Sequence, residues 1–327
     1  MTNFPNGVAS FGQAVLPSVL QQPHSGRVYW VSNNTTTPSS QVLVGQDIAQ
    51  PAGGTYNRPF STIDFAIGQC RSAQGDVIIV KEGHAESVAA ANSILCDVAG
   101  VKIVGLGTGP QRPVITFTTT TTATIGVTAA GVEVHNMIFA ANFDSVVAAF
   151  TLTTAADFHV ENCAFRDTSV TDVSFVNLVD TNTTTNDARR LTLLNNTWIS
   201  EDDASATMVK MDGQNEDVVI SGNRVDFAVS TVVGSLMTIA ANIQVLGLLV
   251  QDNVVTNQAT TVGALITGTA ATSTGWIIHN YVSSKDVAGA SLAAAVTTPL
   301  SLHQNWYTGA LAEPRAIDSI GTIFNDA

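Results

Sequence analysis

Charged and aromatic residues are both scarce in this sequence of 327 residues. Charged residues make up 12% and aromatic residues 6%, and 26 Asp and Glu against 13 Lys and Arg give a net charge of −13. Disordered chains combine low hydrophobicity with dense charge, and coiled coils are rich in Glu, Lys and Arg, so the composition excludes both classes. The acidic balance also opposes a phosphate-binding groove, so we expect no nucleic-acid partner.

Long hydrophobic runs and cysteine motifs are missing as well. The most apolar stretch, residues 236–250, contains two amide side chains. It is shorter than the roughly 18–20 residues of a membrane-spanning helix, so we expect no membrane partner. The N-terminal residues lack the basic start and apolar run of a secretory signal peptide. The three cysteines lie far apart and predict buried thiols: Cys70, Cys96 and Cys163.

The first 75 residues show two patterns. Residues 1–26 contain proline and glycine at intervals that prevent a helix, which predicts an extended N-terminal arm. Its candidate anchoring residues either pack on the same chain or fasten it to a neighbouring subunit: Phe4, Pro5, Phe11, Val15 and Leu16. Residues 27–75 predict a strand at 28–31, a polar loop, and a short helix at 63–70 from apolar spacings of three and four.

A repeated unit dominates the rest of the chain. An apolar-x-apolar run leads into an asparagine and is followed by further apolar residues, as in residues 132–139. The repeated asparagines are Asn136, Asn162, Asn196, Asn223, Asn253, Asn280 and Asn305. Their spacings are 26, 34, 27, 30, 27 and 25 residues, and two of the alignments can shift by one residue.

A period near 28 residues with short strand-like runs predicts an all-β solenoid. No run has a helical partner within its period, which leaves a right-handed, single-stranded parallel β-helix over residues 76–310. Residues 311–327 are then a C-terminal tail. A sharp corner between short strands favours asparagine, and stacked amides can hydrogen-bond along the column. We therefore interpret the asparagine series as a structural ladder.

The N-terminal segments carry a family resemblance. Residues 58–70, followed by residues 75–80 and 83–86, resemble the capping helix and first coil of pectate-lyase-like β-helices. The opening residues 2–12 look like those of β-helix virion proteins of tailed bacteriophages. The resemblance implies a non-enzymatic capsid decoration or cement protein on the virion surface. It also implies assembly in the host cytoplasm as a homotrimer, with the arm bound to the major capsid protein or other virion proteins.

No catalytic set emerges from the remaining residues. The acidic and basic residues that serve pectate lyases and polygalacturonases are missing, and the acidic cluster at residues 201–203 is interpreted as a turn. Arg189 and Arg190 either bind an anion or form salt bridges. The repeat histidines come from different coils: His135, His159, His279 and His303. We therefore expect no enzyme activity, no cofactor and no metal site.

One alternative stays open at this point. A tailspike-like protein that binds or depolymerises a host polysaccharide would also use a β-helix, and its partner would be a host glycan. Such a protein would expose aromatic side chains along one face, so the exposure of Trp198, Trp276 and Trp306 separates the two hypotheses.

Overall fold

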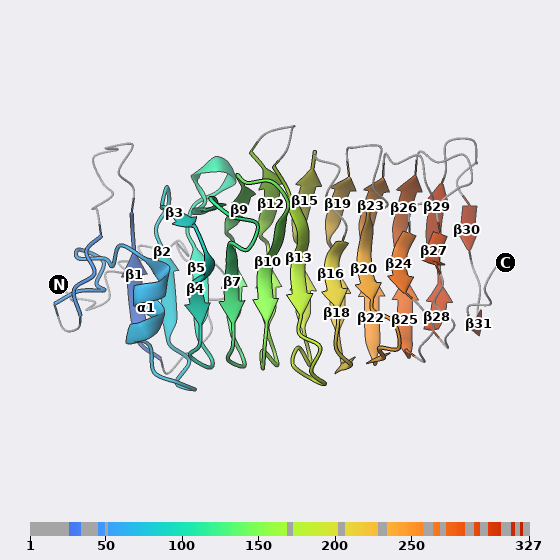
Figure 1. The fold of residues 1–327 in the computed structure, drawn as a ribbon, viewed down its shortest axis with the longest axis horizontal. Coiled ribbons are helices and arrows are strands. Elements are labelled where there is room, and N and C mark those ends of the chain that lie inside the picture. The colour runs from blue at the N-terminus through green and yellow to red at the C-terminus, as the bar shows by residue number, and fades with distance from the viewer. Residues whose placement is uncertain are drawn as a thin grey trace, which may run out of the picture.

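The computed structural model shows an elongated all-β molecule whose coils are stacked along its long axis (Figure 1). The ribbon starts at one end of the rod and finishes at the other. The structure describes residues 26–33, 45–49, 52–168, 173–201, 207–227, 234–257, 264–268, 273–284, 291–294, 300–308, 315–317 and 321–322. Within these ranges, no helix is long and apolar enough to cross a membrane.

Three sheets run along the rod, and successive coils add one strand to each. The first sheet contains β1 (Val28–Val31), β2 (Val77–Val80), β5 (Lys102–Gly105), β8 (Glu133–His135), β11 (His159–Glu161), β14 (Thr192–Leu194), β18 (Val219–Ser221), β22 (Leu248–Gln251), β25 (Gly275–Ile278), β28 (Leu300–His303) and β31 (Gly321–Thr322). The second contains β3 (Ala85–Val88), β6 (Val114–Phe117), β9 (Ile138–Ala141), β12 (Ala164–Asp167), β15 (Thr197–Ser200), β19 (Arg224–Phe227), β23 (Val254–Asn257), β26 (Tyr281–Ser284), β29 (Asn305–Thr308) and β30 (Arg315–Ile317). The third contains β4 (Ala91–Cys96), β7 (Thr124–Val127), β10 (Val146–Leu152), β13 (Phe175–Thr181), β16 (Thr207–Met211), β20 (Ser235–Ile239), β24 (Ala264–Gly268) and β27 (Ser291–Ala294). A small two-stranded sheet joins β17 (Asn215–Glu216) to β21 (Val245–Leu246).

Strand pairing between coils is parallel and keeps equivalent residues in line. In the first sheet, one inward column of buried apolar side chains runs through seven coils: Ile103, Val134, Val160, Leu193, Ile220, Val250 and Ile277. Because a strand's side chains alternate between its faces, the flanking residues of each strand point outward. The predicted parallel β-helix is confirmed.

The ends of the chain extend the same sheets. Strand β1 pairs in parallel with β2, so the segment before residue 76 already belongs to the first sheet. At the other end, β30 and β31 pair antiparallel with β29 and β28. Residues 315–317 and 321–322 of the expected tail are therefore hydrogen-bonded to the last coil.

A short helix, α1 (Ile63–Gln69), covers the N-terminal coils. Thr62 is its N-cap, and the side-chain oxygen of this threonine accepts a hydrogen bond from the Phe65 N–H at 3.3 Å. The Glu86 carboxylate accepts a second helix N–H, from Ile63, at 3.0 Å. The buried face of the helix consists of Ile63, Ala66 and Ile67, as its apolar spacing predicts.

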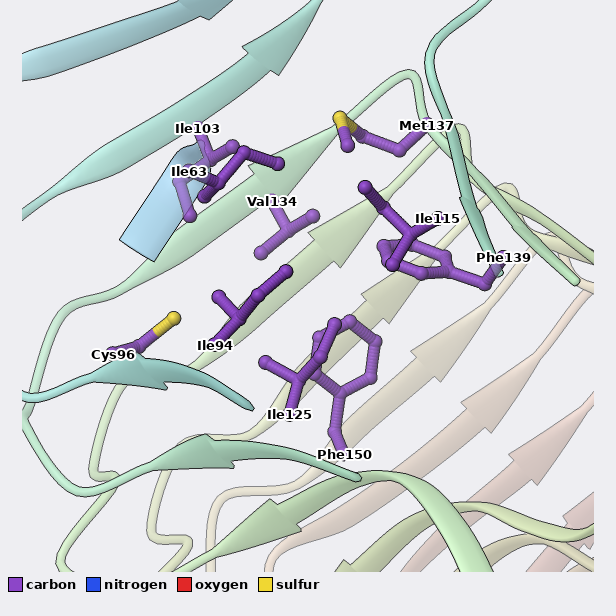
Figure 2. A pocket seen from close by; sticks show the side chains of 10 residues that line it. All are labelled: Ile63, Ile94, Cys96, Ile103, Ile115, Ile125, Val134, Met137, Phe139 and Phe150. Atoms are coloured by element: carbon purple, nitrogen blue, oxygen red, sulfur yellow. The ribbon is translucent and has the colours of Figure 1, made fainter. Parts of the chain in front are cut away.

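The interior is packed with apolar side chains from all three sheets. Near the helix, ten apolar side chains surround a cavity of about 10 Å³ (Figure 2). A buried water needs polar partners, and this lining offers none, so the cavity is a packing defect rather than a ligand site. The three thiols are free. Burial raises the pKa of Cys96 and Cys163 to about 12, so both are inert core residues.

The buried carboxylate of Asp76, just before β2, links the start of β1 to the end of α1. Asp76 accepts hydrogen bonds from the backbone N–H groups of Arg27 at 2.6 Å and Arg71 at 2.8 Å. The Arg71 guanidinium adds an ion pair at 2.7 Å. Burial by itself would raise the pKa of Asp76, but these hydrogen bonds outweigh it and lower the pKa below 3.8.

Replacing this carboxylate is expected to destabilise the cap. Asp76→Asn places an amide group against four N–H donors, and we expect a loss of about 2–4 kcal/mol in the free energy of unfolding. Because the folded pKa is lowered, the stabilisation from Asp76 is complete well above pH 3.8 and is lost as the pH falls below that value. The difference between the wild type and Asp76→Asn should therefore shrink in acid, as measured by denaturant unfolding. The matched control is Asp97→Asn at an exposed position, where we expect less than about 0.5 kcal/mol.

Candidate functional site

A column of five buried asparagines lies at the corner between the first and second sheets. Each stands at or immediately before a strand of the second sheet, and these strands follow one another along the rod (Figure 1). All are at most 1% exposed: Asn196, Asn223, Asn253, Asn280 and Asn305. A polar side chain buried to this extent must find hydrogen-bond partners within the protein.

The amides satisfy one another from coil to coil. The side-chain oxygen of Asn253 accepts hydrogen bonds from the backbone N–H of Asn223 at 2.9 Å and from its Nδ2 at 3.0 Å. The Nδ2 of Asn253 donates to the Ile220 carbonyl at 2.9 Å and to Asn280 Oδ1 at 2.9 Å. The same arrangement links Asn196 to Asn223 and Asn280 to Asn305. Each of the first four amides therefore ties its coil to both neighbours, and Asn305 ties the last coil to the one before it.

Two of the seven asparagines lie one residue away from this column. Asn136 and Asn162 have positive φ angles of 57° and 55°, and the buried position of their coils is filled by Met137 and Cys163. The expectation of seven equivalent asparagines was therefore wrong for these two. In the later coils, the positive-φ position directly precedes the buried asparagine: Asn195, Gly222, Asp252, His279 and Gln304.

The physical reason is that one corner needs two different residues. The left-handed residue turns the chain, and the one after it directs its side chain inward to the ladder. Asn162 is exposed and donates one hydrogen bond from Nδ2, to Asn136 Oδ1 at 3.1 Å. The sequence signal for this split is the doublet Asn195-Asn196, in which both positions are occupied by asparagine.

The arm residues and most of the acidic cluster cannot be placed, whereas Arg190 can. The arm residues Phe4, Pro5, Phe11, Val15 and Leu16 lie outside the described residues, as do Asp202 and Asp203. Arg190 forms an ion pair with Asp157 of the preceding coil, with Nη2 2.6 Å from Asp157 Oδ2. The hydrogen bond from Arg190 lowers the pKa of Asp157. Arg190 therefore joins two coils through a salt bridge.

Two of the repeat histidines are close to each other. The rings of His135 and His159 lie 5.2 Å apart on the outer face of neighbouring coils. The expectation that repeat histidines from different coils lie apart is therefore wrong for this pair. By contrast, the ring of His303 stacks on Trp276 at 5.2 Å.

The tryptophans do not form one stack along the rod. Trp198 is fully buried and packs on Phe227 with ring centroids 5.1 Å apart, whereas Trp276 is 51% exposed on the first sheet and Trp306 is 46% exposed on the second. A different column is exposed on the second sheet, where Tyr281 pairs in register with Val254 on one side and Trp306 on the other. We call Val254, Tyr281 and Trp306 the exposed apolar column.

Comparison with known proteins gives a likeness in structure only. No family model matches the chain, and no curated protein matches it. A solved structure similar to the chain is that of ORF18 of Geobacillus virus E2, with 12% sequence identity and a TM-score of 0.39. The similarity covers 74% of this chain, and the chain spans 57% of the length of that structure.

Proposed function

We propose that this protein is a non-enzymatic structural component of a bacteriophage virion, a homotrimeric decoration or cement protein on the capsid. The observation that carries the proposal is the unbroken run of parallel coils joined by the buried asparagine ladder. Strands of the inner coils pair on both sides, so little backbone is free to open locally. A molecule built this way is a stiff rod suited to withstand mechanical load and proteolysis.

Surface charge agrees with this role. A net charge of −13 on a chain of 327 residues keeps rods and decorated particles apart and in solution. The proposed attachment to the major capsid protein or another virion protein is the N-terminal arm, through Phe4, Pro5, Phe11, Val15 and Leu16. These residues would bury apolar side chains on the shell while the rod projects outward.

A density map of intact particles tests this proposal directly. We expect rods on the capsid surface with their N-terminal ends against the shell. A chain that starts at residue 27 should fold with the same circular dichroism spectrum but fail to bind particles that lack the protein. Finding the protein only at the tail tip would contradict capsid decoration. Binding without residues 1–26 would contradict the role of the arm.

The exposed apolar column is the surface we assign to contact between copies of the rod. Val254, Tyr281 and Trp306 follow one another along the axis, so a parallel second copy can match them over three coils. We expect Tyr281→Lys with Trp306→Glu to reduce the mass in analytical ultracentrifugation from that of a trimer to that of a monomer. The matched control is Trp276→Glu on the first sheet, where we expect the trimer to persist. A wild-type monomer, or a trimer unaffected by the double change, would contradict this assignment.

The same column favours one alternative, recognition of a host polysaccharide. Aromatic side chains that follow one another at the coil spacing offer stacking surfaces for sugar rings. If this alternative holds, the double variant remains trimeric and loses binding to host glycan. Release of reducing sugar ends by the purified protein would overturn the non-enzymatic proposal.

A further inference from the structure

Four titratable side chains form a square on the outer face of the first sheet. Strand β8 contributes Glu133 and His135, and strand β11 contributes His159 and Glu161. The parallel register places His159 beside Glu133 and Glu161 beside His135. Each histidine therefore has a glutamate next to it on its own strand and another on the adjacent strand.

The two histidines and one glutamate converge on a common point. Glu161 Oε2 lies 3.4 Å from His135 Nδ1 and 3.3 Å from His159 Nε2. One ligand atom from each of these three residues falls within 4.8 Å of the other two. In a tetrahedral zinc site, metal–ligand bonds of about 2.0–2.2 Å imply ligand atoms about 3.3–3.6 Å apart. The two measured separations agree with that geometry.

A second carboxylate fixes the orientation of His135. Glu133 Oε2 lies 3.1 Å from His135 Nε2, and Lys102 Nζ lies 2.8 Å from Glu133 Oε1. The contact at Nε2 leaves Nδ1 of the same ring directed toward Glu161. A carboxylate that holds the remote nitrogen of a histidine is the usual support of a metal-binding imidazole. Burial by itself would raise the pKa of Glu133, but hydrogen bonds from His135 and Lys102 lower it to about 2.

The remaining histidine has an unused nitrogen. His159 Nε2 is buried and forms no hydrogen bond of acceptable geometry, although Glu161 lies close to it. A neutral imidazole carries a lone pair on one ring nitrogen, and that nitrogen can bind a metal ion. A buried polar atom without a partner calls for an explanation, and a bound cation supplies one.

We propose that His135 Nδ1, His159 Nε2 and the Glu161 carboxylate bind a divalent transition-metal ion, with zinc as the first choice. Two imidazoles and one carboxylate suit zinc better than calcium or magnesium, which prefer oxygen ligands. Water would complete the coordination of the ion. Because its ligands come from β8 and β11, the ion links two consecutive coils of the rod.

The test uses the untagged full-length chain, dialysed against a chelator and titrated with zinc chloride in a calorimeter. We expect one ion per chain, and a melting temperature that rises with zinc concentration. His159→Gln and Glu161→Gln should each weaken zinc binding by roughly 100-fold, and Glu133→Gln by about 10–100-fold. Cobalt(II) added in place of zinc should give the visible absorption bands of a tetrahedral site in the wild type and not in His159→Gln.

The matched control is His279→Asn. His279 also lies beside an acidic residue, with Nδ1 3.6 Å from Asp252 Oδ1, and zinc affinity should stay within about twofold of wild type. The changed side chains face outward, and circular dichroism checks that each variant is folded. Absence of stoichiometric zinc binding would overturn the proposal, because the square would then be an ion-pair network alone. Equal affinity in the wild type, His159→Gln and Glu161→Gln would overturn it as well.

Discussion

Replacing Asn253 with alanine is expected to lower the free energy of unfolding by about 3–5 kcal/mol, one of the two largest effects that we predict. The change leaves the buried backbone N–H of Asn223 without its acceptor, removes one of the acceptors of Asn223 Nδ2, and removes the amide that donates to the Ile220 carbonyl. Each buried polar group without a partner costs about 1–3 kcal/mol. The midpoint of guanidinium unfolding measures the loss.

The matched control for Asn253→Ala is Asn162→Gly. Asn162 belongs to the same repeat but is exposed, and glycine accepts its positive φ of 55° without strain. We expect this variant to differ from wild type by less than about 0.5 kcal/mol. Equal losses at the two positions would show that the buried column has no special role in stability.

Truncating Phe150 to alanine is expected to lower the free energy of unfolding by about 3–5 kcal/mol. The Phe150 ring is 1% exposed, and its centroid lies 5.1 Å from that of Phe139 and 5.3 Å from that of Phe158. It also borders the small apolar cavity, so the change would enlarge an existing void (Figure 2). Closely packed strands can relax only slightly into such a space.

The control for Phe150→Ala lies on the same strand. Val147 is 41% exposed on β10, and Val147→Ala should change the free energy of unfolding by less than about 0.5 kcal/mol. Thermal unfolding followed by circular dichroism compares the two variants. A loss below about 1 kcal/mol for Phe150→Ala would mean that the aromatic cluster repacks around the gap.

The coil architecture could be predicted from the sequence because asparagines recur with short apolar runs around them. The helix could also be predicted, because Ile63, Ala66 and Ile67 recur at helical spacing and Thr62 is a good N-cap. Both signals are local. They depend on a few neighbouring residues and on a repeat that survives changes in loop length.

The repeat predicts the register between some coils but not between all of them. Between Asn162 and Asn196 the equivalence shifts by one residue, because Asn162 occupies the positive-φ position whereas Asn196 occupies the buried position that Cys163 fills in the earlier coil. His135 and His159 stand at different offsets from Asn136 and Asn162, yet β8 and β11 are adjacent in the sheet. In these two coils residues at equal offsets pair, Glu133 with His159 and His135 with Glu161, so the two histidines meet on the diagonal and matching equal offsets does not find them.

The reversed direction of the last two strands has a consequence for self-association. A stack of parallel strands ends in an open edge that can accept another chain and grow into a fibre. Here β31 and β30 run antiparallel along β28 and β29, so the edge offered to solvent no longer matches the start of a second molecule. Two of the three sheets therefore end in a reversed strand, which opposes end-to-end growth along those sheets, whereas among the described residues the third sheet ends at the parallel strand β27.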